Sequence, residues 1–156
     1  MSPFFASTFI SINGQMKFIL FVVSSMIFRG IVFSMDTLTL EKEIYNKINS
    51  YRKAQGLTKL TYLSENVQSC RQHSKRMGDK WQLFHVSKLD SVHARAEIIQ
   101  LNFTMSQTVL ETAQSVLETF TDSPPHKNIM VSAYQSISVG VFITDDEDLW
   151  VTIRFY

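Results

Sequence analysis

The side chains best suited to chemistry in this chain are histidines and a glutamate that lie far apart in the sequence. Two neutral imidazoles and one carboxylate, such as those of His85, His126 and Glu97, can hold a zinc-like ion with an open coordination position. The same groups can transfer protons without a metal, because histidine titrates near neutral pH. Their spacings are too long for a local motif, so the fold must bring them together.

Nucleophilic catalysis has weaker support in the sequence. Cys70 lies on the apolar stripe of a predicted helix, which indicates a buried thiol, whereas a reactive thiol needs a partly exposed, electropositive setting. Ser123 lies three residues before His126, but a serine that precedes two prolines is typical of a helix cap. We expect His73 and His93 to be solvated or structural, with His93 as an alternative ligand.

Length and charge restrict the class of protein. The 156 residues allow one domain, and 15 basic against 14 acidic residues exclude a strongly basic nucleic-acid-binding surface. A single cysteine excludes a disulfide framework within the chain and a multi-cysteine zinc site.

The first 34 residues have the composition of a signal peptide. Lys17 precedes the apolar stretch 18–28, and a cut after Ser34 is consistent with the small-residue rule. The alternative is an uncleaved anchor, although Arg29 interrupts the stretch well short of the roughly 20 residues that a membrane span needs. Met16 is an alternative start. We therefore predict a signal peptide over 1–34, a secreted or extracytoplasmic chain, and no transmembrane span in the mature protein.

Helical periodicity marks four segments that must position these side chains. A first helix follows a cap at Asp36 or Thr37 and stops at Gly56, and a second runs from Ser64 to Gly78. Ser106 is expected to cap a third helix, and a short fourth spans 125–131. Trp81 and Trp150 are interpreted as packing residues rather than as a stacking platform.

The C-terminal part alternates with a period of two. Apolar residues occupy every second position over 137–143 and 149–155, and the acidic run 145–148 lies between them, which predicts a β-hairpin. A short strand is expected at 97–99. Helices must cover the hairpin's apolar face, so the fold class is α+β, with a small antiparallel sheet in a sandwich.

Taken in order, these segments resemble a known family. They are IYNKINSYR at 44–52, His85 in a loop, Glu97-Ile98-Ile99, FTDSPPHKNIM at 120–130, and the final hairpin. The set resembles the CAP (SCP) domain of cysteine-rich secretory proteins, antigen 5 and pathogenesis-related proteins, in its short, disulfide-free bacterial form. The resemblance covers 36–156 and implies a three-layer α-β-α sandwich, usually secreted.

The resemblance also implies a cleft lined by two histidines and two glutamates. His85, Glu97 and His126 match three of these positions, whereas Ser123 stands where other members carry the second glutamate. Ala96 replaces the family's glycine. The missing carboxylate argues against a mechanism that needs a carboxylate pair. Asn49 and Arg52 are interpreted as structural hydrogen-bonding residues of the first helix.

Three functions remain open at this stage. The first is ligand binding in the cleft by His85, Glu97, His126 and Ser123, with His85 and His126 as candidate ligands of a divalent metal such as zinc. The second is a secreted hydrolase, peptidase-like, that uses the same residues. The third is a structural module of the cell envelope with a vestigial cleft. The partner would be a small ligand, such as a lipid or envelope component, or an extracellular protein, but not nucleic acid.

Overall fold

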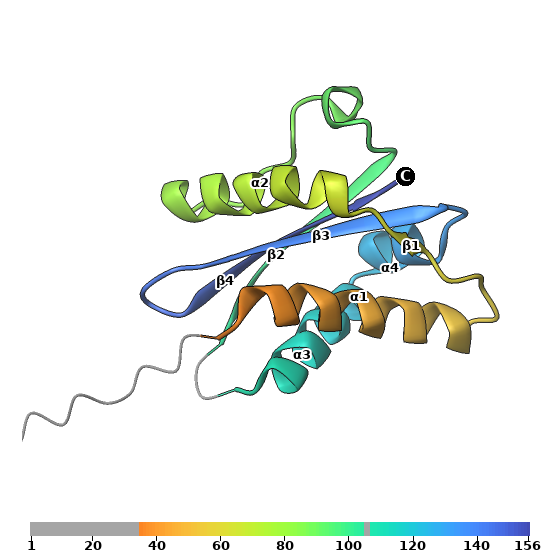
Figure 1. Ribbon diagram of the computed structural model, residues 1–156, viewed down its shortest axis with the longest axis horizontal. Helices are drawn as coiled ribbons and strands as arrows, with labels where there is room; N and C mark the ends of the chain where they lie inside the picture. The colour runs from red at the N-terminus through yellow and green to blue at the C-terminus, as the bar shows by residue number, and fades with distance from the viewer. Residues whose placement is uncertain (1–34, 105–106) are drawn as a thin grey trace, which may run out of the picture. The chain divides into compact units, whose positions relative to one another are not determined.

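The computed structural model describes residues 35–104 and 107–156, which form helices around a four-stranded sheet (Figure 1). The strand order is β1-β3-β4-β2, in which β1 is parallel to β3 and the other pairs are antiparallel. The helices are α1 (Thr37–Ala54), α2 (Val67–Lys80), α3 (Val109–Asp122) and α4 (Pro124–Val131), with 3-10 turns at Ser64–Asn66 and Leu89–Val92. The strands are β1 (Thr61–Tyr62), β2 (Ala96–Phe103), β3 (Ser136–Ile143) and β4 (Asp148–Phe155).

The helices cover both faces of the sheet. α2 lies on one face against β3 and β4, whereas α1, α3 and α4 form a layer on the other (Figure 1). This arrangement confirms the predicted three-layer α-β-α sandwich.

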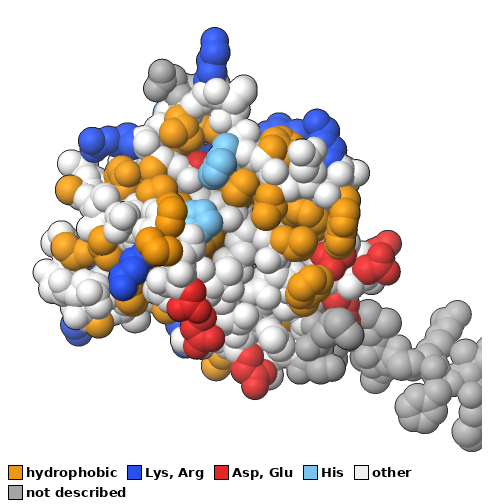
Figure 2. All heavy atoms as spheres, turned by 180° about the vertical axis from the view of Figure 1, so that it is seen from behind, with side chains coloured by type: hydrophobic (Ala, Val, Ile, Leu, Met, Phe, Trp, Pro, Cys, Tyr) orange, Lys and Arg blue, Asp and Glu red, His pale blue; other side chains and the backbone are white. Residues whose placement is uncertain are grey.

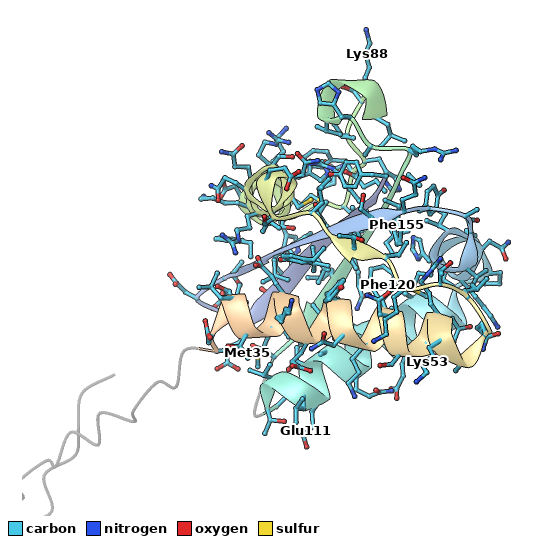
Figure 3. The ribbon with its side chains drawn as sticks, turned by 45° about the vertical axis from the view of Figure 1, so that its right-hand side comes forward. Met35, Lys53, Lys88, Glu111, Phe120 and Phe155 are labelled. Carbon is cyan, nitrogen blue, oxygen red and sulfur yellow. The ribbon has the colours of Figure 1, made fainter. Side chains whose placement is uncertain are left out.

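The main core lies between the sheet and the layer that contains α1 and α3. The alternating residues of the predicted hairpin point into it, and the first-helix stripe of Leu40, Ile44 and Ile48 packs against them. Figure 3 shows Phe120 of α3 between the helices and the sheet, while Lys53 and Glu111 point outward. The hairpin prediction is confirmed, because one face of each strand is apolar and buried.

The opposite face of the sheet is also buried, and it is more polar. Ser74 of α2 donates to the Gly140 carbonyl oxygen over 2.9 Å and hydrogen-bonds the hydroxyl of Thr152 over 2.8 Å. A Cβ added at Gly140 would lie 2.3 Å from the backbone nitrogen of Arg71 and 2.5 Å from Cys70. The lack of a side chain at Gly140 therefore lets α2 approach the sheet closely.

Hydrogen bonds from α1 secure the adjoining loops, as predicted for Asn49 and Arg52. The Asn49 side chain both donates to the Leu60 carbonyl oxygen and accepts from its N–H. Arg52 is buried and donates to three carbonyl oxygens, those of Thr58, Met130 and Ser132.

Several predicted boundaries are wrong. α2 continues past Gly78 to Lys80. Gly78 does not end the helix; its missing side chain leaves room for Phe142, whose ring carbon would lie 2.8 Å from an added Cβ. The N-cap of α3 is Thr108, in a reciprocal capping box with Glu111. The predicted cap Ser106 lies outside the described residues.

The strands also differ in extent from the prediction. β2 spans eight residues rather than three because it pairs with the full length of β4. The two-residue strand β1 was not predicted, because such a short segment carries no periodicity.

The predicted signal peptide over 1–34, with its alternative start at Met16, lies outside the described residues. Within 35–104 and 107–156, none of the helices has the length and apolarity required to cross a bilayer.

Candidate functional site

Glu97 is the centre of the candidate site. It lies on β2 opposite Arg154 of β4, on the sheet face that α2 covers, and its side chain is only 1% exposed. Oε1 accepts a hydrogen bond from the Val86 N–H over 3.0 Å and lies 3.1 Å from His85 Nδ1. Oε2 accepts from the Nε–H of Arg154 over 2.9 Å. Both carboxylate oxygens are therefore engaged by the protein.

The surroundings of Glu97 favour its ionised form. Burial by itself would raise the pKa of Glu97, but the hydrogen bonds from Val86 and Arg154, together with the charge of Arg154, outweigh it. The net pKa lies below the ordinary value of a glutamate. A buried carboxylate at neutral pH is then available as a pure hydrogen-bond acceptor.

His85 is held by this carboxylate at the molecular surface. Its side chain is 57% exposed, and Nδ1 faces Glu97 Oε1. An ionised carboxylate can only accept, so Nδ1 must carry the proton of the neutral ring. Nε2 is then the nitrogen with a free lone pair. The resulting geometry orients a histidine as metal-binding sites do, with a carboxylate fixing its tautomer.

His126 lies on α4, and it is half-buried. Its ring packs edge-on against Phe120, with centroids 5.3 Å apart and an interplanar angle of 88°. Burial is the main cause that lowers the pKa of His126, which favours its neutral ring. Figure 2 shows two histidine side chains near the centre of one face, bordered by apolar side chains.

Ser123 connects α3 to α4 and precedes His126 by one turn. Its backbone carbonyl accepts from the Lys127 N–H over 2.9 Å, but its side chain makes no capping hydrogen bond to α4. Among the described residues, no hydrogen bond joins the Ser123 hydroxyl to His126. Ser123 is thus the N-cap of α4, as predicted, although its hydroxyl takes no part in the cap, and no base is paired with that hydroxyl among the described residues.

Arg154 was not singled out from the sequence, although it completes the site. It is fully buried, and besides Glu97 it contacts the Ser69 hydroxyl through Nη1. Its Nη2 is buried without a hydrogen-bond partner among the described residues. A lone arginine among the apolar residues of a predicted strand was the signal that could have identified it.

His73 is a second buried residue of this network. Its Nε2 lies 2.8 Å from the Phe84 carbonyl oxygen, its Nδ1 lies 3.0 Å from Arg76 Nη2, and its Nε2 is 3.7 Å from Glu97 Oε1. Burial lowers the pKa of His73 more than the charge of Glu97 raises it, so the neutral ring is favoured. His73 is thus structural, one of the two roles expected for it.

The metal-binding capacity of the site is limited. Within the described part of the chain, no three side chains of histidine, cysteine, aspartate or glutamate are placed to hold a metal ion. Glu97 is engaged by other groups, so the protein could offer a zinc ion only the imidazoles of His85 and His126. The remaining ligands would have to be water or another molecule.

Other candidates lie outside this site. Cys70 is fully buried, which confirms the predicted buried thiol, and burial is the main cause that raises its pKa to about 12. His93 is exposed in a left-handed backbone conformation, and no described ion pair joins it to Glu97. A separate groove of about 280 Å³ lies between α2 and β3, where it is lined by Gln68, Arg71 and Phe142 among others, and contains no histidine.

Comparison with known proteins identifies the family. The family model "CAP: Cysteine-rich secretory protein family" matches residues 45–155. No curated protein matches the sequence. Similar solved structures include an outer surface protein from Borrelia burgdorferi, with a TM-score of 0.62 and 17% identity over 78% of this chain and 95% of that one.

Two further structures share the fold at low identity. An extracellular protein from Bacillus anthracis that contains an SCP domain gives a TM-score of 0.59 and 16% identity, over 76% of this chain and 41% of that one. NaASP2, solved with Zn²⁺, gives a TM-score of 0.61 and 12% identity, over 80% of this chain and 82% of that one. The family match extends over most of the chain, and the fold agrees with it: the chain belongs to the CAP, or cysteine-rich secretory protein, family.

Proposed function

We propose that this CAP protein acts outside the cytoplasm as a binding protein, and that its ligand is held by the imidazoles of His85 and His126. The observation that carries the proposal is the hydrogen bond between His85 Nδ1 and the buried carboxylate of Glu97. This hydrogen bond leaves Nε2 of His85 as a lone-pair donor, and burial favours the neutral form of His126.

The chemistry of the two rings defines the class of ligand. Neutral imidazole nitrogens accept hydrogen bonds from O–H or N–H groups and bind zinc-like divalent ions. Glu97 acts as a positioning residue, because both its oxygens already have protein partners. The ligand is therefore either a molecule with hydrogen-bond donors or a divalent ion that also binds water. Zn²⁺ in the structure of NaASP2 supports the use of zinc as the probe.

Calorimetric titration with Zn²⁺ alone tests the proposal. The parent protein should bind zinc, and His85→Ala and His126→Ala should each remove the binding. His93→Ala is the matched control, since it removes an exposed histidine outside the pair. A parent that binds no zinc, or binding that both variants retain, would overturn the paired-imidazole site.

A hydrolase has less support from the structure. The thiol of Cys70 is buried with a pKa of about 12, and among the described residues no base is hydrogen-bonded to the Ser123 hydroxyl. The envelope module with a vestigial cleft makes a distinct prediction: alanine at His85, Glu97 and His126 together would leave capture of its partner intact.

The extracytoplasmic location rests on the composition of residues 1–34, and extracellular or outer-surface relatives support it. Mass spectrometry of the protein from a secreting host should find Met35 as the first residue. A retained N-terminus in membrane fractions would favour the anchor instead.

A further inference from the structure

Exposed apolar side chains form a further feature of the surface. Trp81 is 60% exposed, Leu83 46% and Phe103 52%, and Leu101 is half-buried. We call Trp81, Leu83, Leu101 and Phe103 the apolar patch. Large exposed apolar groups that gather on one surface are typical of an interface.

Contacts through Trp150 connect Trp81 with Leu101. The Trp81 ring packs edge-on against Trp150 with centroids 5.4 Å apart, and Trp150 pairs with Leu101 across the β4–β2 ladder. Phe103 follows Leu101 on the same face of β2, since side chains alternate along a strand. β2 is also the last strand of the sheet order.

Trp81 is held outward by the backbone. It is the C-cap of α2 and adopts a left-handed conformation with φ 50° and ψ 42°, which a bulky residue seldom does. This geometry directs the chain from α2 toward Leu83 and leaves the indole largely exposed. An unfavourable conformation retained at an exposed tryptophan points to a use for that side chain.

Basic groups of α2 lie over aromatic rings that pack against the cluster containing Trp150. Lys75 Nζ lies 5.2 Å from the centroid of the Phe142 ring, and Lys80 Nζ lies 5.0 Å from that of Phe84. Arg76 adds a third basic group, and Asp79, paired with Lys75, offsets only one of them. We call Lys75, Arg76 and Lys80 the basic edge.

Acidic groups border the patch at the β3–β4 turn. Asp145, Asp146 and Glu147 are all exposed there, and we call them the acidic edge. Figure 2 shows apolar side chains at one side of the face, with basic groups above them and acidic groups below. The apolar patch therefore lies between edges of opposite charge.

This pattern is complementary to itself. A two-fold axis that lies in the plane of the interface, between the two edges, would set the basic edge of one copy against the acidic edge of the other, twice. An anionic membrane would attract the basic edge but repel the acidic edge beside it. We therefore infer that the apolar patch is the interface of a weak homodimer of this chain, with Trp81 at its centre.

Complementary charge reversal provides the test. Sedimentation of the purified chain, expressed from its full sequence, should show reversible dimers at concentrations below about 1 mM. Lys75→Glu with Lys80→Glu makes both edges acidic, and Asp145→Lys with Asp146→Lys makes both basic. Each double variant should be monomeric alone, and an equimolar mixture should form heterodimers. Lys53→Glu with Lys59→Glu, which changes exposed lysines near the end of α1, should leave the dimer unchanged.

The apolar part of the inference has its own control. Trp81→Ala should weaken dimerisation at least about tenfold, as interface tryptophans do, whereas Leu38→Ala and Leu110→Ala, equally exposed elsewhere, should not. Thermal melting confirms that each variant is folded. A parent that is monomeric up to about 1 mM overturns the inference. The inference is also overturned if the mixture of the two charge variants fails to associate, or if the chain is a monomer that binds phosphatidylglycerol vesicles through this patch. None of these outcomes bears on the zinc titration.

Discussion

Replacing Arg154 with methionine should destabilise the domain by about 3–5 kcal/mol, because the carboxylate of Glu97 would stay buried without its cation. Arg154 is fully buried, and its Nε–H donates to Glu97 Oε2 over 2.9 Å. Methionine fills much of the same volume, so the loss of stability measures mainly the effect of leaving the Glu97 carboxylate buried without its cation. A loss of this size is a large fraction of a total stability of about 5–15 kcal/mol.

Urea unfolding at pH 7, followed by tryptophan fluorescence, measures this loss. Arg154→Met combined with Glu97→Gln should recover part of the stability, since the double variant buries no charge at this site. Arg95→Met is the control. Arg95 is exposed, so this substitution should lower the free energy of unfolding by less than about 1 kcal/mol. The reasoning is refuted if the effects of the two substitutions simply add, or if Arg154→Met costs no more than the control.

Three further predictions concern stability. Gly140→Ala should lower the melting temperature well below that of the parent, because the new Cβ would lie 2.3–2.5 Å from α2; an unchanged melting temperature would contradict the close approach. Burial lowers the pKa of His73, so the unfolded chain binds a proton that the folded chain excludes, and stability should fall as the pH drops below 6.5. His73→Gln should reduce that slope between about pH 7 and pH 5, and an unchanged slope would show that His73 does not cause it. Deleting Ile153–Tyr156 removes two large core side chains, each of which contributes roughly 1.5–3 kcal/mol. The truncated chain should therefore be unfolded, and a truncated chain that still melts cooperatively would contradict the core assignment.

The elements with regular periodicity could be predicted from the sequence alone. The hairpin follows from strict alternation over 137–143 and 149–155, and the stripe of Leu40, Ile44 and Ile48 identifies the buried face of α1. The ends of elements were less predictable because tertiary contacts decide them. Gly78 resembled a helix stop, yet its role is to admit Phe142 from β3.

The candidate site could likewise be predicted only in part. The resemblance to the CAP family supplied His85, Glu97 and His126, and the structure brings His85 into hydrogen-bond contact with Glu97. Arg154 and the contacts of His73 were missed, since alternation assigns Arg154 to the outer face of its strand. Only the position of α2, which comes from distant contacts, shows that this face is buried.

Trp81 illustrates a further limit of sequence reasoning. Both tryptophans are predicted to be packing residues. Trp150 is buried, whereas Trp81 packs edge-on against Trp150 and is still 60% exposed. Its exposure results from the left-handed conformation at the end of α2, which no side-chain pattern reveals for a residue other than glycine.

The most direct test of the paired-imidazole site is a histidine ring ¹⁵N NMR spectrum recorded during titration with Zn²⁺. Before zinc is added, His85 should show a protonated Nδ1 and an unprotonated Nε2. Zinc should then shift the ring nitrogens of His85 and His126 together while His93 stays unchanged. A proton on Nε2 of His85, or zinc-dependent shifts that leave His126 unaffected, would contradict the account.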